Sequence, residues 1–237
     1  MTTTQKMTSL FFLICVFSFV GGCNYFQSKN QAKRIDESVV TQTEKNKLEL
    51  LGTIERKFEN PDAHYELGKL YQADGLWMQA EYEYNTALSF DPAHRNAQAA
   101  IVKLLLDTGD ETKSGIYADI YMNQVSSSAR ESLRLALGFQ DVNLDEYALE
   151  CYRQALHLAP NSAKINRQIG YYYLSKNDKV RAQDYLSRSF QLNPNQPEVA
   201  GELGRLGVEI KIPRKTVRNV GKLDKIVEQS DEAAAKP

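Results

Sequence analysis

One period runs through the middle of this chain and constrains its fold more than any other feature. From Pro61 to Gln196 the sequence repeats every 34 residues, without an insertion, over residues 61–94, 95–128, 129–162 and 163–196. A period of this length indicates an array of small structural units stacked in a row. Each unit has an apolar face that only its neighbours can bury, so the core of such a chain extends along the whole array.

Two sets of apolar positions within each repeat have helical spacing. Positions 7, 8 and 11 share one face of a helix, and positions 20, 24 and 27 do the same further along. Position 7 is aliphatic in every repeat, for example Leu67 and Leu135. Position 11 is large and apolar in every repeat, for example Tyr71 and Tyr173. The pattern therefore predicts two helices in each repeat.

Small and turn-forming residues punctuate the same period. Position 8 is Gly68 in the first repeat and Gly170 in the fourth, which predicts that the paired helices approach closely there. Position 15 favours a left-handed turn after the first helix and is occupied by Gly75, Gly109, Asn143 and Asn177. The second repeat departs from the pattern at positions 8, 27 and 32, so its second helix fits the pattern least.

This pattern resembles the tetratricopeptide repeat (TPR) over residues 61–196. The resemblance implies an all-α fold, a right-handed TPR α-solenoid of four 34-residue helix-turn-helix repeats with a groove lined by the first helices. Flanking helices are expected to cap it. Leu48, Leu51, Ile54 and Phe58 predict a packing helix in residues 47–60, and residues 197–210 resemble a C-terminal cap helix.

The N-terminus is predicted to be a signal peptide covering residues 1–22. Its apolar run, Leu10 to Val20, is shorter than the ~20 residues that span a bilayer, which favours export. The run ends in Val20-Gly21-Gly22-Cys23, which resembles the lipobox of bacterial lipoproteins and implies lipidation of Cys23. An ordinary leader with a chance cysteine is the alternative. Residues 23–46 are expected to form a polar tether.

These features predict a location in the bacterial cell envelope. The lipidated chain would face the periplasm, and Asn24 after the cysteine, in place of Asp, favours the outer membrane. Two or more acyl chains hold a protein stably on a membrane. Residues 211–237 begin with a basic stretch and are expected to end in a disordered tail.

Composition and motifs exclude several classes of function. The chain has 29 Lys and Arg against 30 Asp and Glu, which argues against a nucleic-acid partner. Its three histidines are far apart in sequence, and no phosphate-binding loop or metal motif occurs. We therefore expect no catalytic residue, no metal and no cofactor. Cys151, the cysteine that remains free in the exported chain, is interpreted as a packing residue.

Candidate binding residues are expected along the groove. Tyr65 and Tyr171 occupy positions that line the groove in the TPR family, where exposed aromatic residues are unusual. Basic residues occupy neighbouring positions: Lys69, Lys103, Arg130, Arg134, Lys164 and Arg167. This combination suits an acidic or carboxylate-bearing peptide. The alternative is an ordinary charged helix surface, because acidic residues such as Asp62 and Asp141 lie close by.

The sequence thus predicts a non-enzymatic, lipid-anchored scaffold that binds an envelope protein or peptide. The resemblance suggests pilus or secretion assembly, or the organisation of cell-wall enzymes, as its setting. Two alternatives stay open. One is a peptidoglycan- or glycan-binding module that stacks sugars on Tyr65, Tyr171 and Trp77. The other is an accessory subunit of an envelope enzyme.

Overall fold

The computed structural model describes residues 41–209 of the chain. The predicted signal peptide, Cys23, most of the expected tether and the residues after Glu209 lie outside the described residues. Within residues 41–209 there are ten α-helices and no strand, so the predicted all-α class is confirmed. The chain divides into two units, residues 1–49 and 50–237, and all of the paired helices belong to the second.

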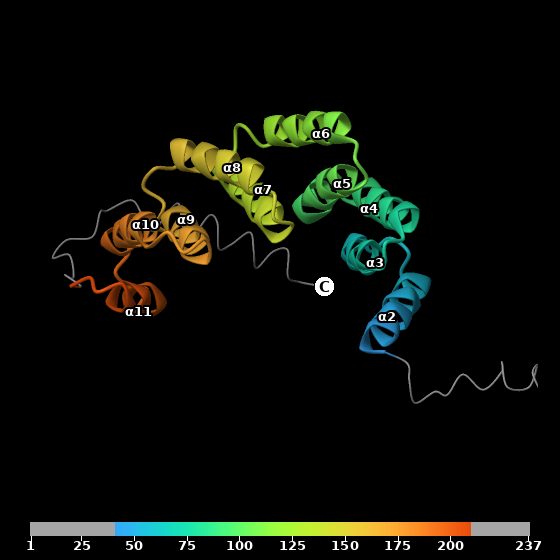
Figure 1. The fold of residues 1–237 in the computed structure, drawn as a ribbon, viewed down its shortest axis with the longest axis horizontal. Coiled ribbons are helices and arrows are strands. Elements are labelled where there is room, and N and C mark those ends of the chain that lie inside the picture. Colours follow the sequence, from blue (N-terminus) through green and yellow to red (C-terminus); the bar gives the residue numbers. More distant parts are fainter. Residues whose placement is uncertain (1–40, 210–237) are drawn as a thin grey trace, which may run out of the picture. The chain divides into compact units, whose positions relative to one another are not determined.

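The helices from Pro61 onward come in pairs that follow one another along the chain (Figure 1). The first helix of each pair packs against the second helix of the same pair. Their bounds are α3 Pro61–Ala73 with α4 Trp77–Phe90, α5 Arg95–Asp107 with α6 Glu111–Gln124, α7 Ala129–Asp141 with α8 Asp145–Leu158, and α9 Ala163–Ser175 with α10 Lys179–Leu192. A single helix, α11 Pro197–Arg205, follows.

Each pair turns at the residue predicted to adopt a left-handed conformation. The φ angles are 73° at Gly75, 86° at Gly109, 60° at Asn143 and 57° at Asn177. Glycine lacks the Cβ that disfavours positive φ, and asparagine tolerates it better than most residues. The prediction of left-handed turns at position 15 is therefore confirmed.

The predicted close approach of paired helices is also confirmed. A Cβ built on Gly68 would lie 2.6 Å from the Tyr84 ring, and one built on Gly170 would lie 2.6 Å from the Leu186 side chain. Both of those larger residues are completely buried. Glycine at position 8 thus leaves space next to the first helix, and a large residue of the second helix occupies it.

The main core runs continuously from α5 to α10. Leu135 and Tyr173 belong to it and are 0% and 9% exposed, as predicted. Helix α5 also packs against α7, where a Cβ on Gly138 would lie 3.1 Å from the Arg95 carbonyl oxygen. Helix α6 forms despite its irregular sequence. It leaves Ile116 and Ile120 exposed.

The N-terminal helix differs from its prediction. Helix α2 spans Gln42–Arg56, so it begins inside the expected tether and ends before Phe58. None of its residues is buried, and Leu48 and Leu51 are exposed, so these two leucines do not pack as predicted. Its many Glu, Lys, Gln and Leu residues favour a helix by intrinsic propensity, without requiring a buried face.

Phe58 lies beyond α2 and packs against the first helix pair. Its ring makes edge-to-face contacts with His64 and Phe90, and its carbonyl oxygen accepts a hydrogen bond from His64 Nε2 at 2.8 Å. At the other end of the array, Val199 and Leu203 of α11 are buried against Leu186 and Phe190. Helix α11 therefore covers apolar surface of the last pair.

Candidate functional site

A cavity of about 320 Å³ is lined by residues from the first three helix pairs, on or next to their first helices α3, α5 and α7. Helix α7 contributes Arg134, Leu137 and Asp141, which are three and four residues apart and therefore share one face. The remaining lining residues come from the N-terminal ends of α3 and α5: Asp62, His94, Arg95 and Asn96. The cavity therefore presents a cation, an apolar side chain and an anion in a row along α7.

Glu131 lies at the centre of an arginine cluster beside this cavity. Arg95 Nε donates a hydrogen bond to Glu131 Oε2 at 3.0 Å, and Arg130 Nε donates to Oε1, also at 3.0 Å. Arg134 Nη1 lies 3.7 Å from Oε1. Burial acts to raise the pKa of Glu131, but the arginine hydrogen bonds and charges outweigh it, so the pKa falls below its ordinary value. Glu131 is therefore an anion that orients three arginines.

The other predicted groove cations also have partners within the chain. Lys69 pairs with Glu66 at 2.9 Å, and Lys103 pairs with Asp107. Arg167 Nη1 donates to Gln196 Oε1 at 3.2 Å, away from the Glu131 cluster. Lys164 is half-buried on α9. Carboxylates of the same helices therefore neutralise Lys69 and Lys103, as the alternative of an ordinary charged helix surface expects.

Arg134 is the predicted groove cation that stays most available at the cavity. Half of its side chain is exposed, and its contact with Glu131 is longer than a hydrogen bond. Its guanidinium therefore keeps N–H donors that can bind an external acceptor. Arg130 is less exposed and is held by a hydrogen bond to Glu131.

Asp62 and Asp141 form the anionic side of the cavity, and neither was predicted from the sequence to be a binding residue. Asp141 is an exposed residue, yet partial burial of its carboxylate raises its pKa, and the charge of Lys69 only partly opposes this. Asp62 accepts a hydrogen bond from His94 Nε2 at 3.0 Å. His94 Nδ1 accepts from the Ala97 N–H at 3.1 Å, so the His94 side chain caps the start of α5. The seven-residue spacing of Arg134 and Asp141 was the available sequence signal.

Tyr65, predicted to be exposed in the groove, is buried. It is 6% exposed and packs between the rings of Tyr84 and His94, with centroid distances of 6.0 and 5.0 Å. Burial raises its pKa to about 12, with a smaller contribution from the charges of Glu66 and Asp141. The predicted exposure is wrong because the side chain at this position turns toward α4 and the start of α5.

Tyr171 is half-buried and packs on the cluster that holds α11. Burial raises its pKa, and the charge of Arg167 opposes the change. Trp77 is 41% exposed but is the first residue of α4, a second helix. The three aromatic residues proposed for sugar stacking therefore lie on different helices, and Tyr65 has no free face to offer.

Comparisons with known proteins give the following similarities. No protein-family model matches the sequence. The chain is 27% identical over 173 residues to the type IV pilus assembly protein PilF of Pseudomonas aeruginosa. This match covers 70% of this chain and 66% of that protein, which is less than two thirds of its length.

Two solved structures are similar in their helices. A structure of Pseudomonas aeruginosa PilF is 22% identical, covers 72% of this chain and 72% of its own, and has a TM-score of 0.36. A structure of YrrB, a TPR protein with an unusual peptide-binding site, is 14% identical, covers 70% of this chain and 85% of its own, and has a TM-score of 0.36.

Three features decide the fold: the helix pairs, the close glycine contacts between paired helices, and the left-handed turn after each first helix. The chain has the tetratricopeptide-repeat fold. In the TPR array, the cavity residues belong to the first helices, which is the location that the sequence predicted for the groove.

The part of the TPR chain between residues 41 and 209 offers little for metal or thiol chemistry. It holds no group of three or more His, Cys, Asp or Glu side chains placed to bind a metal ion. Cys151 is completely buried, and burial, with the charge of Glu150, raises the pKa of its thiol to about 12. Its interpretation as a packing residue agrees with this burial. None of the helices in the same range is long and apolar enough to cross a membrane.

Proposed function

We propose that this protein is a non-enzymatic, lipid-anchored scaffold of the bacterial envelope that binds a segment of another protein in the cavity formed by α3, α5 and α7. The lipid on Cys23 would hold the chain on the periplasmic side of a membrane, with the outer membrane favoured. The TPR fold and the similarity to a type IV pilus assembly protein support an interaction role. Pilus or secretion assembly and the organisation of cell-wall enzymes are the proposed settings.

The observation that carries this proposal is the cavity with Arg134 at its wall. A carboxylate of the partner segment would bind the free N–H donors of Arg134, because arginine and carboxylate geometries match. Leu137 would contact an apolar side chain of the same segment. The partner is therefore proposed to carry an acidic group, as the basic residues of the sequence suggested, with one arginine as its main contact.

A crosslinked pull-down from membranes tests this function and identifies the partner. The wild-type chain should retain a partner protein, and binding should weaken as salt is added because an exposed ion pair is screened. Arg134→Glu should abolish retention. Arg153→Glu is the matched control, since Arg153 is an exposed arginine on α8 that pairs with Glu150. Equal retention by wild type and Arg134→Glu at all salt concentrations would contradict the proposal.

The lipid anchor has a separate test. Cys23→Ser should release the protein from membranes and prevent removal of the leader, because the thiol that receives the lipid is gone. Fractionation and the apparent mass of the chain measure both effects. Normal processing with unchanged membrane retention would contradict the lipobox interpretation.

A further inference from the structure

Helix α4 exposes an apolar stripe that the proposed groove does not use. Met78 is 82% exposed and Tyr82 is 61% exposed, one turn apart, and Trp77 adds a 41% exposed ring at the start of the helix. We call Trp77, Met78 and Tyr82 the α4 stripe. It borders a cavity of about 340 Å³ that is also lined by Tyr71, Gln79 and Glu83. Large exposed apolar side chains gathered on one surface indicate an interaction site.

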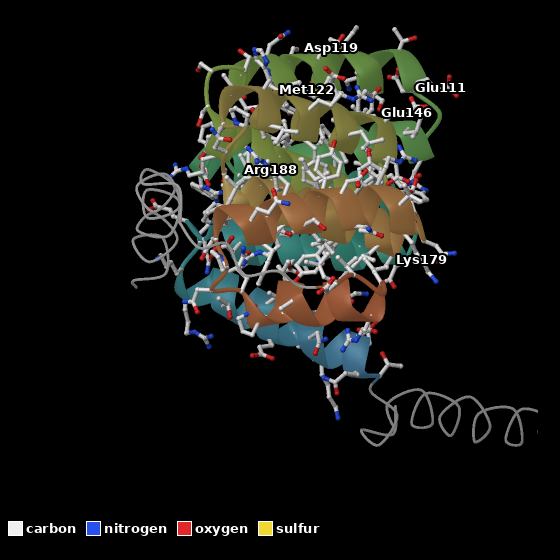
Figure 2. All side chains as sticks on the ribbon, turned by 90° about the vertical axis from the view of Figure 1, so that its left-hand side faces the viewer. Glu111, Asp119, Met122, Glu146, Lys179 and Arg188 are labelled. Carbon is white, nitrogen blue, oxygen red and sulfur yellow. The ribbon has the colours of Figure 1, made fainter. Side chains whose placement is uncertain are left out.

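Among the second helices between residues 61 and 192, only α4 has a large apolar residue at all three positions of the stripe. Single apolar residues are also exposed at these positions in other second helices, Ile116 in α6 and Val180 in α10. Glu146 and Glu150 of α8 occupy the positions that Met78 and Tyr82 occupy in α4, and both are exposed. Figure 2 labels further charged side chains on second helices of later pairs: Glu111 and Asp119 on α6, and Lys179 and Arg188 on α10. The end of a helical array normally needs a polar surface to stay soluble. The first pair departs from this rule.

The neighbouring face of α4 corresponds to one that is covered in a later pair. Tyr147 and Cys151 of α8 occupy the positions of Gln79 and Glu83. Cys151 is completely buried, and a Cβ built on Gly115 of α6 would lie 3.9 Å from the Tyr147 hydroxyl. In α8 this face is therefore covered at Cys151, and the Tyr147 hydroxyl lies close to Gly115 of the preceding pair. In α4 the same face borders the 340 Å³ cavity.

The charge of α4 restricts what binds there. The helix contains two acidic residues, Glu81 and Glu83, and no Lys or Arg. Glu83 is held by His64 Nδ1 at 2.6 Å, whereas Glu81 is exposed. A helix with an apolar stripe and basic flanks would complement this surface in both hydrophobicity and charge.

The chain itself carries such a sequence, after the last described residue. Residues 211–225 contain six basic residues and one acid. Val217, Val220, Leu223 and Val227 are three, three and four residues apart, so on a helix they would share one face, with the basic residues opposite. We propose that residues 211–227 of the same chain dock on the α4 stripe. One contact then accounts for both the exposed stripe and the basic amphipathic segment.

Trp77, the single tryptophan of the chain, reports on this contact. Docking should protect its ring, so acrylamide should quench the emission of the full chain less than that of the full-length variant Leu223→Asp, which puts a charge into the docked face. Gln229→Asp is the control, because it adds the same charge outside the segment. Glu81→Lys should expose Trp77 to the quencher by repelling the basic flank. Helical content by circular dichroism verifies that each variant is folded.

Crosslinking gives a second measurement in full-length chains carrying both Cys15→Ser and Cys23→Ser, which leave only the buried Cys151 beside the introduced thiols. A bifunctional thiol reagent should join Tyr82→Cys to Leu223→Cys in high yield. The matched control replaces Tyr82→Cys with Asp184→Cys, since Asp184 is exposed at the corresponding position of α10. Products of one-chain mass at all dilutions support docking within one chain, whereas two-chain products that disappear on dilution would contradict it and indicate docking between copies.

The competing occupant of the basic segment is a membrane, because basic amphipathic helices also bind anionic lipid. Binding of the full-length chain to vesicles of phosphatidylglycerol and phosphatidylcholine tests this alternative. The proposal is overturned if Trp77 quenching is the same in wild type and Leu223→Asp and if Tyr82→Cys crosslinks no better than Asp184→Cys. Vesicle binding that depends on Leu223, together with those two results, would assign the segment to the membrane.

Discussion

Arg95 on α5 donates a hydrogen bond from Nε to Glu131 Oε2 on α7 across 3.0 Å. The two side chains are only 10% and 16% exposed, so solvent screens the ion pair weakly. The pair joins the first helices of two successive helix pairs at the edge of the proposed binding cavity. Glu131 therefore links the packing of the array to the orientation of the cavity arginines.

Replacing Glu131 with Gln should destabilise the protein. The substitution keeps the shape of the side chain but leaves Arg95 without its charged acceptor, which should lower the free energy of unfolding by about 1–3 kcal/mol. Chemical denaturation followed by circular dichroism measures this. The control is Glu150→Gln, because Glu150 and Arg153 are both well exposed and their pair should contribute little. Equal stability of wild type and Glu131→Gln would contradict the linking role.

The contribution of Glu131 should depend on pH in a defined direction. Its pKa in the folded chain is lowered from 4.5, because the arginine contacts outweigh the effect of burial. A lowered carboxylate pKa stabilises the fold above the unfolded pKa, and this stabilisation disappears as the pH falls through the folded value. The stability difference between wild type and Glu131→Gln should be constant near neutral pH and shrink below pH 4.5. A difference that grows with acidity would contradict this sign.

Adding a methyl group at Gly68 should overpack the first helix pair. The Cβ of Gly68→Ala would lie 2.6 Å from the buried Tyr84 ring, so one of the helices must shift, at a cost of about 1–3 kcal/mol. Thermal unfolding measures the loss. Gly201→Ala on α11 is the control. Nothing lies within 4 Å of its new Cβ, and alanine favours a helix, so this variant should be as stable as wild type or more stable.

Truncating Leu135 should create a cavity in the continuous core. Leu135 is completely buried on α7, so Leu135→Ala should lower the free energy of unfolding by about 2–5 kcal/mol. Because neighbouring repeats stabilise one another, amide hydrogen exchange should become faster in the helix pairs on both sides. A loss below about 0.5 kcal/mol, or an effect confined to α7, would contradict this account of the array.

The sequence by itself determined the local geometry of the repeat. Asn143 and Asn177 lie at turn positions that require positive φ, and Gly68 and Gly170 lie where paired helices come too close for a side chain. These features were predictable because each depends on steric requirements of a few residues. They recur at a fixed spacing, so each repeat supports the interpretation of the others.

Only the tertiary structure decided the partners of the polar and aromatic side chains. Arg130 and Arg134 were correctly placed on one face of α7, but the sequence did not indicate that Glu131 binds both of them and Arg95 from another pair. Tyr65 is buried and Leu48 is exposed, against expectation, because burial depends on how neighbouring helices cover a residue. Helical spacing specifies which residues share a face, whereas the packing of adjacent helices determines whether that face is buried, paired or available for binding.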